Sequence, residues 1–472
     1  MIKRISLSFF LFFIYLSINA IEKKNEIDTD IPVLKIETID GVMPTCDIIE
    51  APEGCFGTSI TNNNYVSGRM VITLKSDTVY DSKEYVKGQS GMAIKIRGNS
   101  TGAFLNQHPY KIKLSSKDDL LRRQDDSFNH KEWVLLSMYT WNKEMSNSES
   151  NILTIVGLLI SKIIGMEWCP NYELVHLIIN HDYQGMYYLI EPIERGKKRI
   201  DISKTGFLIE HDAFWWKENV YFKSNYIDDR FAYTYKYPDD DDVTEEVQDN
   251  IKSYINLFGE SLYNNDKISN YIDLESFAKW LLIHDILGSE AIGSNRFLYK
   301  YDLKQNNIYT SKLKMSTPWD FDSSFRCSSW SDIHHSSIYY FPKLLENTQF
   351  LQTYLSLWNN IKPSLLSQFK DSMNVIKLRY ADIFDRNMKI HQTKYPTEGT
   401  NSFANQVDEV IEKIADRISI LEQLITTDIN QNVNISIPYK KSNPYNLNGQ
   451  RIQLLQLNKG IYIRNGKKYI VQ

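Results

Sequence analysis

The chain has 472 residues, of which 42% are hydrophobic and 24% are charged, and its formal net charge is −4. This length is ample for a large core in one or two domains. The small negative charge does not favour a nucleic-acid partner. Aromatic residues reach 13% of the chain, which suits well-packed cores first and sugar contacts second.

Residues 1–20 have the pattern of a signal peptide. Lys3 and Arg4 form a basic start, an apolar run follows from Leu7 to Leu16, and Ala20 supplies a small residue at the cut. The run is shorter than a membrane-spanning helix requires. The sequence therefore predicts export, to the cell surface or beyond it.

The first half is expected to be rich in strands, because apolar and polar residues alternate along several segments. A β-rich extension is expected over residues 21–90. The predicted strands are Ile31–Thr38, Gly68–Leu74, Gly91–Ile96, Tyr110–Leu114, Leu174–Asn180 and Met186–Ile190. The last two form a predicted hairpin that turns over His181–Gly185. Between them and the earlier strands, Leu153–Ile164 is predicted to be a buried helix that ends at Gly165.

The second half is expected to be helical. Apolar residues at helical spacing predict helices over Val243–Phe258, Asp273–Leu287, Ser364–Lys389 and Gln406–Thr427. Asp273 is a candidate N-cap. Pro363 is predicted to separate the third of these helices from a shorter one over Thr353–Asn360. The fold class is therefore α+β, with a β-rich N-terminal half and a helical C-terminal half.

The last residues, 439–472, change in character. A linker-like stretch is followed by two apolar runs around Asn465-Gly466, which is a strong hairpin signal. This segment resembles the small β tails of proteins exported through type IX-like secretion, which implies contact with outer-membrane secretion machinery. The alternative is a terminal hairpin packed on the preceding domain.

Four cysteines are present, and an exported chain permits disulfides between them. Cys46 and Cys55 bracket a short loop and are the favoured pair. Cys169 and Cys327 either pair with each other or remain thiols. Their spacing is not that of a zinc site.

The stretch Trp319-Asp320-Phe321-Asp322 follows a strand-like segment and contains two candidate metal ligands, Asp320 and Asp322. Two carboxylates at i and i+2 suit a divalent metal whose other ligands are phosphate oxygens. An ordinary hydrogen-bonded turn would use the same residues.

Six motifs in order make the chain resemble the CotH kinase family, an atypical, secreted relative of protein kinases. They are Arg97-Gly98-Asn99-Ser100, Pro109-Tyr110-Lys111-Ile112-Lys113-Leu114, Trp133-Val134-Leu135-Leu136, Gly185-Met186-Tyr187-Tyr188-Leu189-Ile190-Glu191, Phe297-Leu298-Tyr299-Lys300 and Pro318-Trp319-Asp320-Phe321-Asp322. The resemblance implies a two-lobe kinase-like domain over residues 91–438. It also implies ATP and Mg²⁺ or Mn²⁺ as cofactors, and a secreted or surface protein as the substrate.

The resemblance assigns roles to particular residues. Arg97 is expected to grip phosphate, although a structural role in its turn is the alternative. Lys111 or Lys113 is expected to contact the α- and β-phosphates, and Glu191 to hold that lysine in place. Asp320 and Asp322 are expected to hold the metal.

A departure from the family pattern lies in the catalytic loop. The family's presumed catalytic aspartate stands five residues before an asparagine, and counting back from Asn295 gives Glu290. The extra methylene of glutamate can move a carboxylate by about 1 Å, which can cost about a hundredfold in rate. The leading hypothesis is an exported protein Ser/Thr kinase. The rival is an inactive pseudokinase that binds surfaces, with glycan contact through Phe214-Trp215-Trp216.

Overall fold

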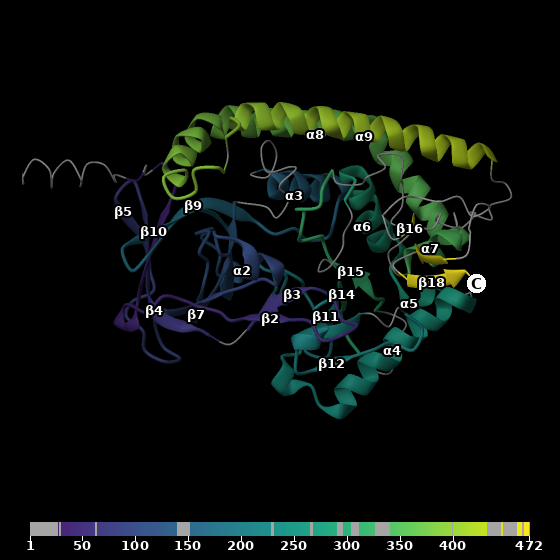
Figure 1. Ribbon diagram of the computed structural model, residues 1–472, viewed down its shortest axis with the longest axis horizontal. Coiled ribbons are helices and arrows are strands. Elements are labelled where there is room, and N and C mark those ends of the chain that lie inside the picture. Colours follow the sequence, from purple (N-terminus) through teal and green to yellow (C-terminus); the bar gives the residue numbers. More distant parts are fainter. Residues whose placement is uncertain are drawn as a thin grey trace, which may run out of the picture. The chain divides into compact units, whose positions relative to one another are not determined.

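The computed structural model in Figure 1 describes residues 27, 30–61, 64–138, 152–227, 231–264, 268–289, 296–303, 311–325, 340–398, 400–431, 445–446, 460–464 and 467–471. The chain divides into two compact units, Met1–Leu424 and Ile425–Gln472. The first unit is β-rich in its N-terminal part and helical in its C-terminal part, as the sequence predicts.

An eight-stranded sheet forms the first part of unit 1. Its strands, in spatial order, are β1 (Val33–Thr38), β9 (Tyr172–Ile179), β10 (Asp182–Ile190), β8 (His130–Ser137), β7 (Tyr110–Asp118), β6 (Met92–Ile96), β4 (Val66–Leu74) and β5 (Asp77–Asp81). β1 also pairs with β4, so the sheet closes on itself and leaves β5 beside β4. The boundary predicted at residue 91 lies within this one sheet, because β1, β4 and β5 precede it.

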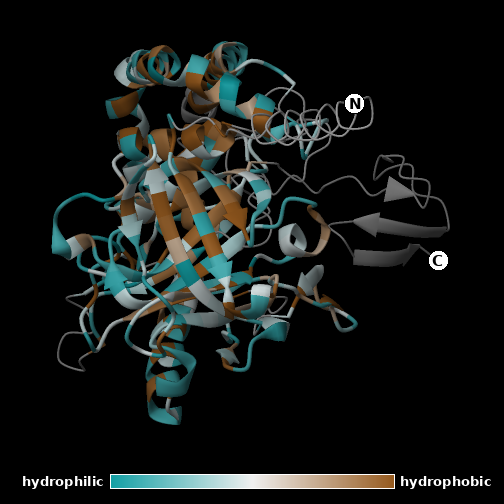
Figure 2. Ribbon diagram, turned by 90° about the vertical axis from the view of Figure 1, so that its left-hand side faces the viewer, coloured by the Kyte–Doolittle hydropathy of each residue, from teal (hydrophilic) through white to brown (hydrophobic). Residues whose placement is uncertain are grey.

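The inside of the closed sheet is a hydrophobic core. Alternation along each strand sends every second side chain inward, and Ile94, Ile112, Trp133, Leu177 and Leu189 are fully buried there. Figure 2 shows brown, hydrophobic residues along the strands and teal residues in the surrounding loops. The opposite side chains of β6, β7 and β8 are therefore left to face the rest of the unit.

The hairpin of β9 and β10 is confirmed, but its predicted turn is wrong. The strands turn at Asn180 and His181, both in the left-handed region with φ of 49° and 65°. Pairing already resumes at Asp182, and the register shift near Gly185 is a bulge within β10. Gly185, which the sequence analysis placed in the turn, lies at this bulge instead, with φ of 112°.

A second sheet has the strand order β12 (Tyr221–Phe222), β13 (Ala232–Tyr237), β11 (Phe207–Asp212), β14 (Phe297–Lys300) and β15 (Lys314–Met315). A small hairpin pairs β2 (Ile48–Glu50) with β3 (Thr58–Ile60). In this second sheet, β11 is central and pairs with both β13 and β14.

The helices of unit 1 include α2 (Ser100–Phe104), α3 (Leu153–Ile164), α4 (Glu245–Asn264), α5 (Ile268–Tyr271), α6 (Leu274–Leu287), α7 (Phe341–Glu346), α8 (Thr348–His391) and most of α9 (Phe403–Gln431). Short 3₁₀ turns cover Ile39–Gly41, Asp126–Phe128, Trp215–Lys217 and Asp240–Asp242. The predicted cap of α6 is confirmed, since Asp273 accepts a 2.7 Å hydrogen bond from the Ser276 backbone N–H.

The break predicted at Pro363 is wrong, because α8 runs unbroken through this residue. A proline removes one backbone donor, which tertiary packing can outweigh. Here Trp358 on one side and Leu365 and Phe369 on the other are all buried. Figure 1 shows α8 changing direction along its length, as proline-containing helices do.

The helices α8 and α9 run antiparallel. Lys362 pairs with Glu422 and Lys377 pairs with Asp408, so the numbering rises on one helix as it falls on the other. α8 also packs against α3 and α6. Within the described part of the chain, no helix is both long enough and apolar enough to cross a membrane.

The predicted Cys46–Cys55 disulfide is wrong, because both cysteines are free thiols. The pairing of β2 with β3 explains the outcome. It brings Ile48 opposite Ile60, which places Cys46 at the open end of this hairpin and Cys55 at its tip. Cys169 is also free, and Cys327 lies outside the described residues.

The second unit contains β16 (Tyr445–Asn446), β17 (Gly460–Arg464) and β18 (Lys467–Val471) in one antiparallel sheet. Arg464 pairs with Lys467, which confirms the predicted hairpin. Its turn residues, Asn465 and Gly466, lie outside the described residues. The likeness to a secretion tail stays a prediction.

The left-handed end of α3 gives the first testable prediction. Gly165 caps the helix at φ of 82°, a conformation that costs a residue with a Cβ about 1 kcal/mol. We expect Gly165→Ala to lower the free energy of unfolding by about that amount in urea titrations. Gly165→Asn, which tolerates this conformation better, should lose less. Equal losses in the two variants would contradict the explanation.

Candidate functional site

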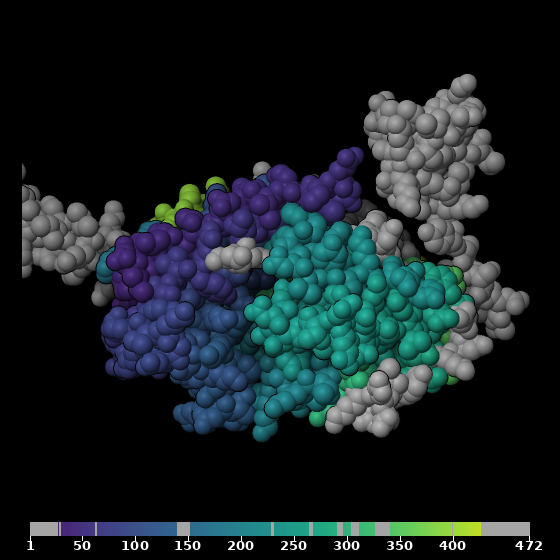
Figure 3. Space-filling model, turned by 90° about the horizontal axis from the view of Figure 1, so that it is seen from below, coloured from purple at the N-terminus to yellow at the C-terminus, as the bar shows by residue number. Residues whose placement is uncertain are grey.

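The outer face of the closed sheet carries a row of cations. Lys95 lies between buried residues on β6, Arg97 follows directly after this strand, and Lys111 and Lys113 alternate with buried residues on β7. Cross-strand pairing sets Lys95 directly opposite Lys111. Figure 3 shows the surface hollowed where the purple and blue residues of this sheet meet the teal residues that follow.

Lys111 is held by two carboxyl groups. Its ammonium group contacts Glu132 of β8 directly and lies 3.7 Å from Glu194, in the segment after β10. The side chain of Lys111 is only 28% exposed, whereas that of Lys113 is 54% exposed and lies 3.8 Å from Glu132. The sequence left the two lysines equivalent, and the structure makes Lys111 the fixed one.

Glu191 does not hold this lysine. Its buried carboxylate accepts hydrogen bonds from Arg123 at 2.8 Å and from the backbone and side chain of Asn171 at 2.9 and 3.0 Å. It also lies 3.9 Å from Arg199. The role that the family resemblance gave to Glu191 is filled here by Glu132 and Glu194.

Arg199 connects Glu191 with the two carboxyl groups that hold Lys111. Its side chain is fully buried, pairs with Glu194 at 2.9 Å and donates to the Glu132 backbone carbonyl at 3.1 Å. A continuous network of ion pairs and hydrogen bonds therefore runs from Glu191 through Arg199 and Glu194 to Lys111. Charges this deep are tolerated only when each has a partner.

The two carboxyl groups beside Lys111 share one proton. Burial, followed by the hydrogen bond and charge of Glu132, raises the pKa of Glu194 to about 8. Burial opposes ionisation of Glu132 as well, but the hydrogen bond with Glu194 and the Lys111 charge lower its pKa to about 2. Glu194 is thus the protonated partner near neutral pH.

The Trp319–Asp322 turn lies near Arg97. The Asp322 backbone N–H donates to the Asp320 carboxylate at 3.1 Å, and both carboxylates are partly exposed. The Arg97 guanidinium lies 5.9 Å from the centre of the Trp319 ring. Burial lowers the pKa of Arg97, and the Asp320 carboxylate opposes this effect. The structure therefore brings the predicted phosphate-binding arginine and the predicted metal ligand together.

Phe321 anchors this turn from inside. Its ring rests on Gly157 of α3, where a Cβ atom would come within 2.0 Å of the ring. Only glycine leaves room for such an approach in mid-helix. Further along, the Phe325 N–H donates to the Leu287 carbonyl at 2.7 Å, which ties the turn to the end of α6.

The predicted catalytic loop begins where α6 ends. The Ser289 hydroxyl contacts His284 at 3.1 Å and Ser323 at 2.9 Å, so the end of α6 and the aspartate turn share a hydrogen-bond chain. Glu290 and Asn295 themselves lie outside the described residues. Their predicted roles stay predictions.

Further charges belong to the second sheet and were missed by the sequence reading. Glu210 and Asp212 lie on one face of β11, and Lys236 on β13 pairs with Glu210 at 3.1 Å. The other oxygen of the buried Glu210 carboxylate, Oε1, has no hydrogen-bond partner within the described chain. The Glu210 charge also favours the charged form of Arg97. Carboxylates at i and i+2, directly after the apolar run Phe207-Leu208-Ile209, were the available signal.

The surroundings of Asp212 favour the protonated form of its carboxyl group. Burial, and next the Glu210 charge, raise the pKa of Asp212 to about 7. The carboxyl accepts hydrogen bonds from the Phe214 N–H at 2.8 Å and from the Thr234 hydroxyl at 3.2 Å. On the facing sheet, burial lowers the pKa of Lys95 to about 8, with the Lys111 charge adding to the effect.

The aromatic segment proposed for glycan contact is largely engaged within the chain. Phe214 is buried, and the Trp216 indole donates to the Phe56 carbonyl at 3.0 Å. The Trp215 ring contacts Tyr221 in a tilted arrangement, with ring centres 4.7 Å apart. Glycan contact through this segment stays a prediction.

The candidate metal ligands within the described residues are the two carboxylates of the aspartate turn. Within the described residues, no three His, Cys, Asp or Glu side chains gather closely enough to hold a metal ion by themselves. Asp320 and Asp322 provide two carboxylates, and Mg²⁺ is commonly held by one or two carboxylates with substrate phosphates and water. The arrangement of cations, carboxylates and a fixed lysine fits a phosphate-bearing ligand.

Comparison with known proteins gives one positive result. The family model described as CotH kinase protein matches residues 94–421, which include all the charged residues described in this subsection. No curated protein matches the chain.

The contact between Phe321 and Gly157 predicts a compensating pair of substitutions. Gly157→Ala overpacks the site and should cost about 1–3 kcal/mol in the free energy of unfolding. We expect Phe321→Leu to recover part of this loss, so the double variant should be more stable than the two single losses predict. Urea titration of all four proteins measures the coupling, and strict additivity would contradict the contact.

The raised pKa of Glu194 predicts how stability depends on pH. Between its ordinary pKa of 4.5 and the folded value of about 8, the folded chain keeps a proton that the unfolded chain has lost. This contribution to stability is complete below pH 4.5 and is lost as the pH rises through 8. Glu194→Gln cannot ionise, so its stability relative to the parent should increase from pH 5 to pH 8.

Urea titrations at pH 5, 6, 7 and 8 measure this difference. Glu246→Gln, at an exposed position on α4, is the matched control and should show a constant difference from the parent. A constant difference for Glu194→Gln as well would contradict the shared proton.

Proposed function

The chain belongs to the CotH kinase family, and we propose that it is an exported protein kinase that transfers the γ-phosphate of ATP to Ser or Thr hydroxyls. The single observation that carries this proposal is the fixed lysine. Lys111 projects from the closed sheet, is held by Glu132 and Glu194, and faces the same region as Arg97 and Asp320. Phosphoryl transfer depends on such positioned charges more than on covalent chemistry.

The phosphates would be bound by cations of the closed sheet. Lys111 acts as a point charge whose position is set by its two carboxylates. Arg97 offers a planar guanidinium that can donate two parallel hydrogen bonds to phosphate oxygens. Lys95, opposite Lys111 on β6, adds a third cation to the same face.

A divalent metal, Mg²⁺ or Mn²⁺, would be held by Asp320 together with Asp322 or Asn295. The carboxylates are partly exposed, as ligands that share a metal with a substrate must be. The metal supplies neutralisation of negative charge on the phosphates. Glu210 has one carboxylate oxygen without a described hydrogen-bond partner, and its charge lies near Arg97, which makes it a further candidate ligand.

Acceptor orientation is assigned to Glu290, with the kinase-like two-lobe arrangement as its setting. The closed sheet would correspond to the first lobe, and the second sheet with its helices to the second. The Ser289–Ser323 hydrogen bond supports this assignment, because it links the chain just before Glu290 to the aspartate turn. The acceptor is a surface or secreted protein.

Export follows from the N-terminal pattern rather than from the site. Residues 1–20 would direct the chain across the membrane, and residues 439–472 would engage outer-membrane secretion machinery. The protein would then work at the cell surface or in the medium. The hairpin of β17 and β18 supports a compact tail of the kind that this proposal needs.

Nucleotide binding tests the proposal before any substrate is known. We expect Mg²⁺-ATP to raise the melting temperature of the parent protein, because a ligand that binds only the folded state stabilises it. Lys111→Ala should weaken binding at least about tenfold, equivalent to about 1.4 kcal/mol, and Asp320→Ala should abolish the metal dependence. Lys113→Ala, which removes a more exposed lysine from the same strand, should bind nearly normally.

Two results would contradict these assignments. A parent protein that shows no shift with millimolar ATP and either metal would contradict the kinase proposal. It would favour the alternative of an inactive pseudokinase that acts as a surface-binding protein. Binding that Lys111→Ala and Lys113→Ala weaken equally would contradict the assignment of Lys111.

A further inference from the structure

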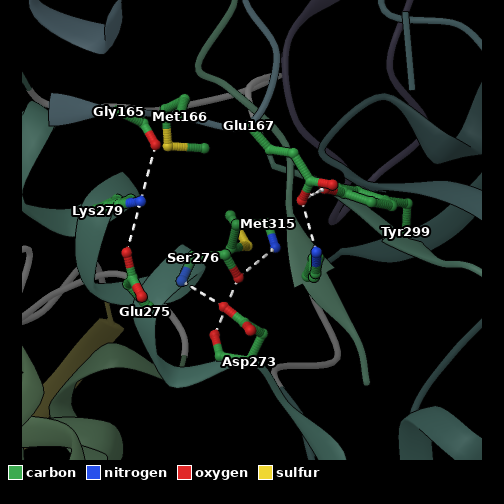
Figure 4. Close-up of a pocket in the computed structure, with 10 residues that line it drawn as sticks. Gly165, Met166, Glu167, Asp273, Glu275, Ser276, Lys279, Tyr299 and Met315 are labelled. Atoms are coloured by element: carbon green, nitrogen blue, oxygen red, sulfur yellow. Dashed lines mark hydrogen bonds and ion pairs between the residues drawn. The ribbon is translucent and has the colours of Figure 1, made fainter. Parts of the chain in front are cut away.

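The pocket in Figure 4 lies beside β14 and β15 and has a volume of about 290 Å³. Its charged side chains contact one another: Lys279 pairs with Glu275 at 2.6 Å, and Lys314 pairs with Glu167 at 2.6 Å. Because these charges neutralise one another, the described part of this pocket gives no sign of a ligand. The outer face of the closed sheet, which carries the cations of the charged site, offers a more informative contact.

The chain before the family match contributes an aromatic residue to this outer face. Tyr65 comes directly before β4. Val66, the first residue of β4, pairs with Ile94 of β6, and the antiparallel register therefore brings Tyr65 beside Lys95. Lys95 in turn pairs with Lys111 of β7. Alternate positions along a strand share one face, so these three side chains lie on the outer face, opposite the hydrophobic core.

The Lys95 ammonium group lies over the Tyr65 ring, 4.8 Å from the ring centre. The electron-rich face of an aromatic ring attracts a cation within about 6 Å of its centre. Tyr65 is 37% exposed, so this contact lies at the surface of the sheet. The Tyr65 hydroxyl makes no hydrogen bond to another described residue. The ring, rather than the hydroxyl, is therefore the part of Tyr65 that holds the lysine.

The charges around Lys95 show what the ring contributes. Burial lowers the pKa of Lys95 to about 8, and the charges of Lys111 on β7 and Lys217 after β11 add to this effect. Glu132 on β8 and Glu218 next to Lys217 favour the charged form. The aromatic ring favours the ammonium form as well, because only a cation is attracted to its face. It therefore offsets part of the repulsion between the two neighbouring lysines of β6 and β7.

We propose that Tyr65 is a positioning residue of the charged site: its ring holds the Lys95 ammonium beside Lys111, so that both cations contact the same phosphate chain. The identity of this ligand rests on the proposed function. The family model begins at residue 94, so Tyr65 is not among the residues that it matches. The earlier part of the chain, which supplies β1, β4 and β5 to the closed sheet, thus takes part in the site.

The geometry is tested by NMR on the full chain with its lysines dimethylated with ¹³C, a modification that keeps their charge. Lys95→Arg identifies the Lys95 signal. The ring current of Tyr65 should move this signal upfield in the parent and in Tyr65→Phe, and Tyr65→Leu should lose this shift. Because the ring favours the charged form, Lys95 should also titrate at a lower pH in Tyr65→Leu. The Tyr65 hydroxyl does not titrate in this range, since burial and next the Glu132 and Glu194 charges raise its pKa.

Inorganic tripolyphosphate, which carries no base, tests the consequence for binding by calorimetry at pH 7. Tyr65→Leu should weaken its binding about two- to fivefold, which corresponds to the loss of one cation–aromatic contact at an exposed site. Tyr65→Phe keeps the ring and should bind as the parent does. Tyr301→Leu, at an exposed tyrosine directly after β14, is the matched control and should also bind as the parent does.

Three results overturn the proposal. They are an unchanged Lys95 signal in Tyr65→Leu, loss of the upfield shift in Tyr65→Phe, and binding of tripolyphosphate by Tyr65→Leu with the affinity of the parent. A parent protein that binds neither tripolyphosphate nor Mg²⁺-ATP contradicts the proposed function instead. In that case the Lys95 signal still decides whether the ring holds this lysine, so the two failures are distinguishable.

Discussion

The network of ion pairs and hydrogen bonds that runs from Glu191 through Arg199 and Glu194 to Lys111 is the constraint on which the charged site depends. It joins β7, β8 and the segment after β10, and its members Glu191 and Arg199 are fully buried. Removing one member leaves its partner uncompensated, which costs about 3–5 kcal/mol for a buried pair. Lys111 is therefore held in one position by the same interactions that join these parts of the sheet.

The aspartate turn depends on packing rather than on charge. Phe321 lies on the surface that Gly157 leaves open on α3, and this contact fixes the direction of the neighbouring Asp320 and Asp322. The turn is also bonded to the end of α6, where the Phe325 N–H meets the Leu287 carbonyl. The acidic side of the site is thus positioned by helices, while its basic side is positioned by the closed sheet.

Local signals in the sequence predicted the local structure well. Alternation identified most of the core strands, and Gly165 and Asp273 marked helix ends, because each depends on the residue's own conformational or hydrogen-bonding preference. The helix break predicted at Pro363 was wrong because its buried neighbours keep α8 helical across it. The sequence analysis expected Glu191 to hold the lysine, but its partner Arg123 comes from a distant segment. Glu132 and Glu194 reach Lys111 only because the sheet closes. Such pairings are set by strand register, which a single sequence does not reveal.

The shared proton determines the electrostatic character of the lysine face. With Glu194 protonated, Glu132 alone balances Lys111, and the carboxyl pair carries one negative charge rather than two. Ionisation of Glu194 at about pH 8 adds a negative charge, and loss of the Lys95 proton at about the same pH removes a positive one. Both changes lower the potential that attracts phosphate, so they reinforce each other. An anion bound here should favour the protonated forms of both groups, so that its binding takes up protons near pH 8.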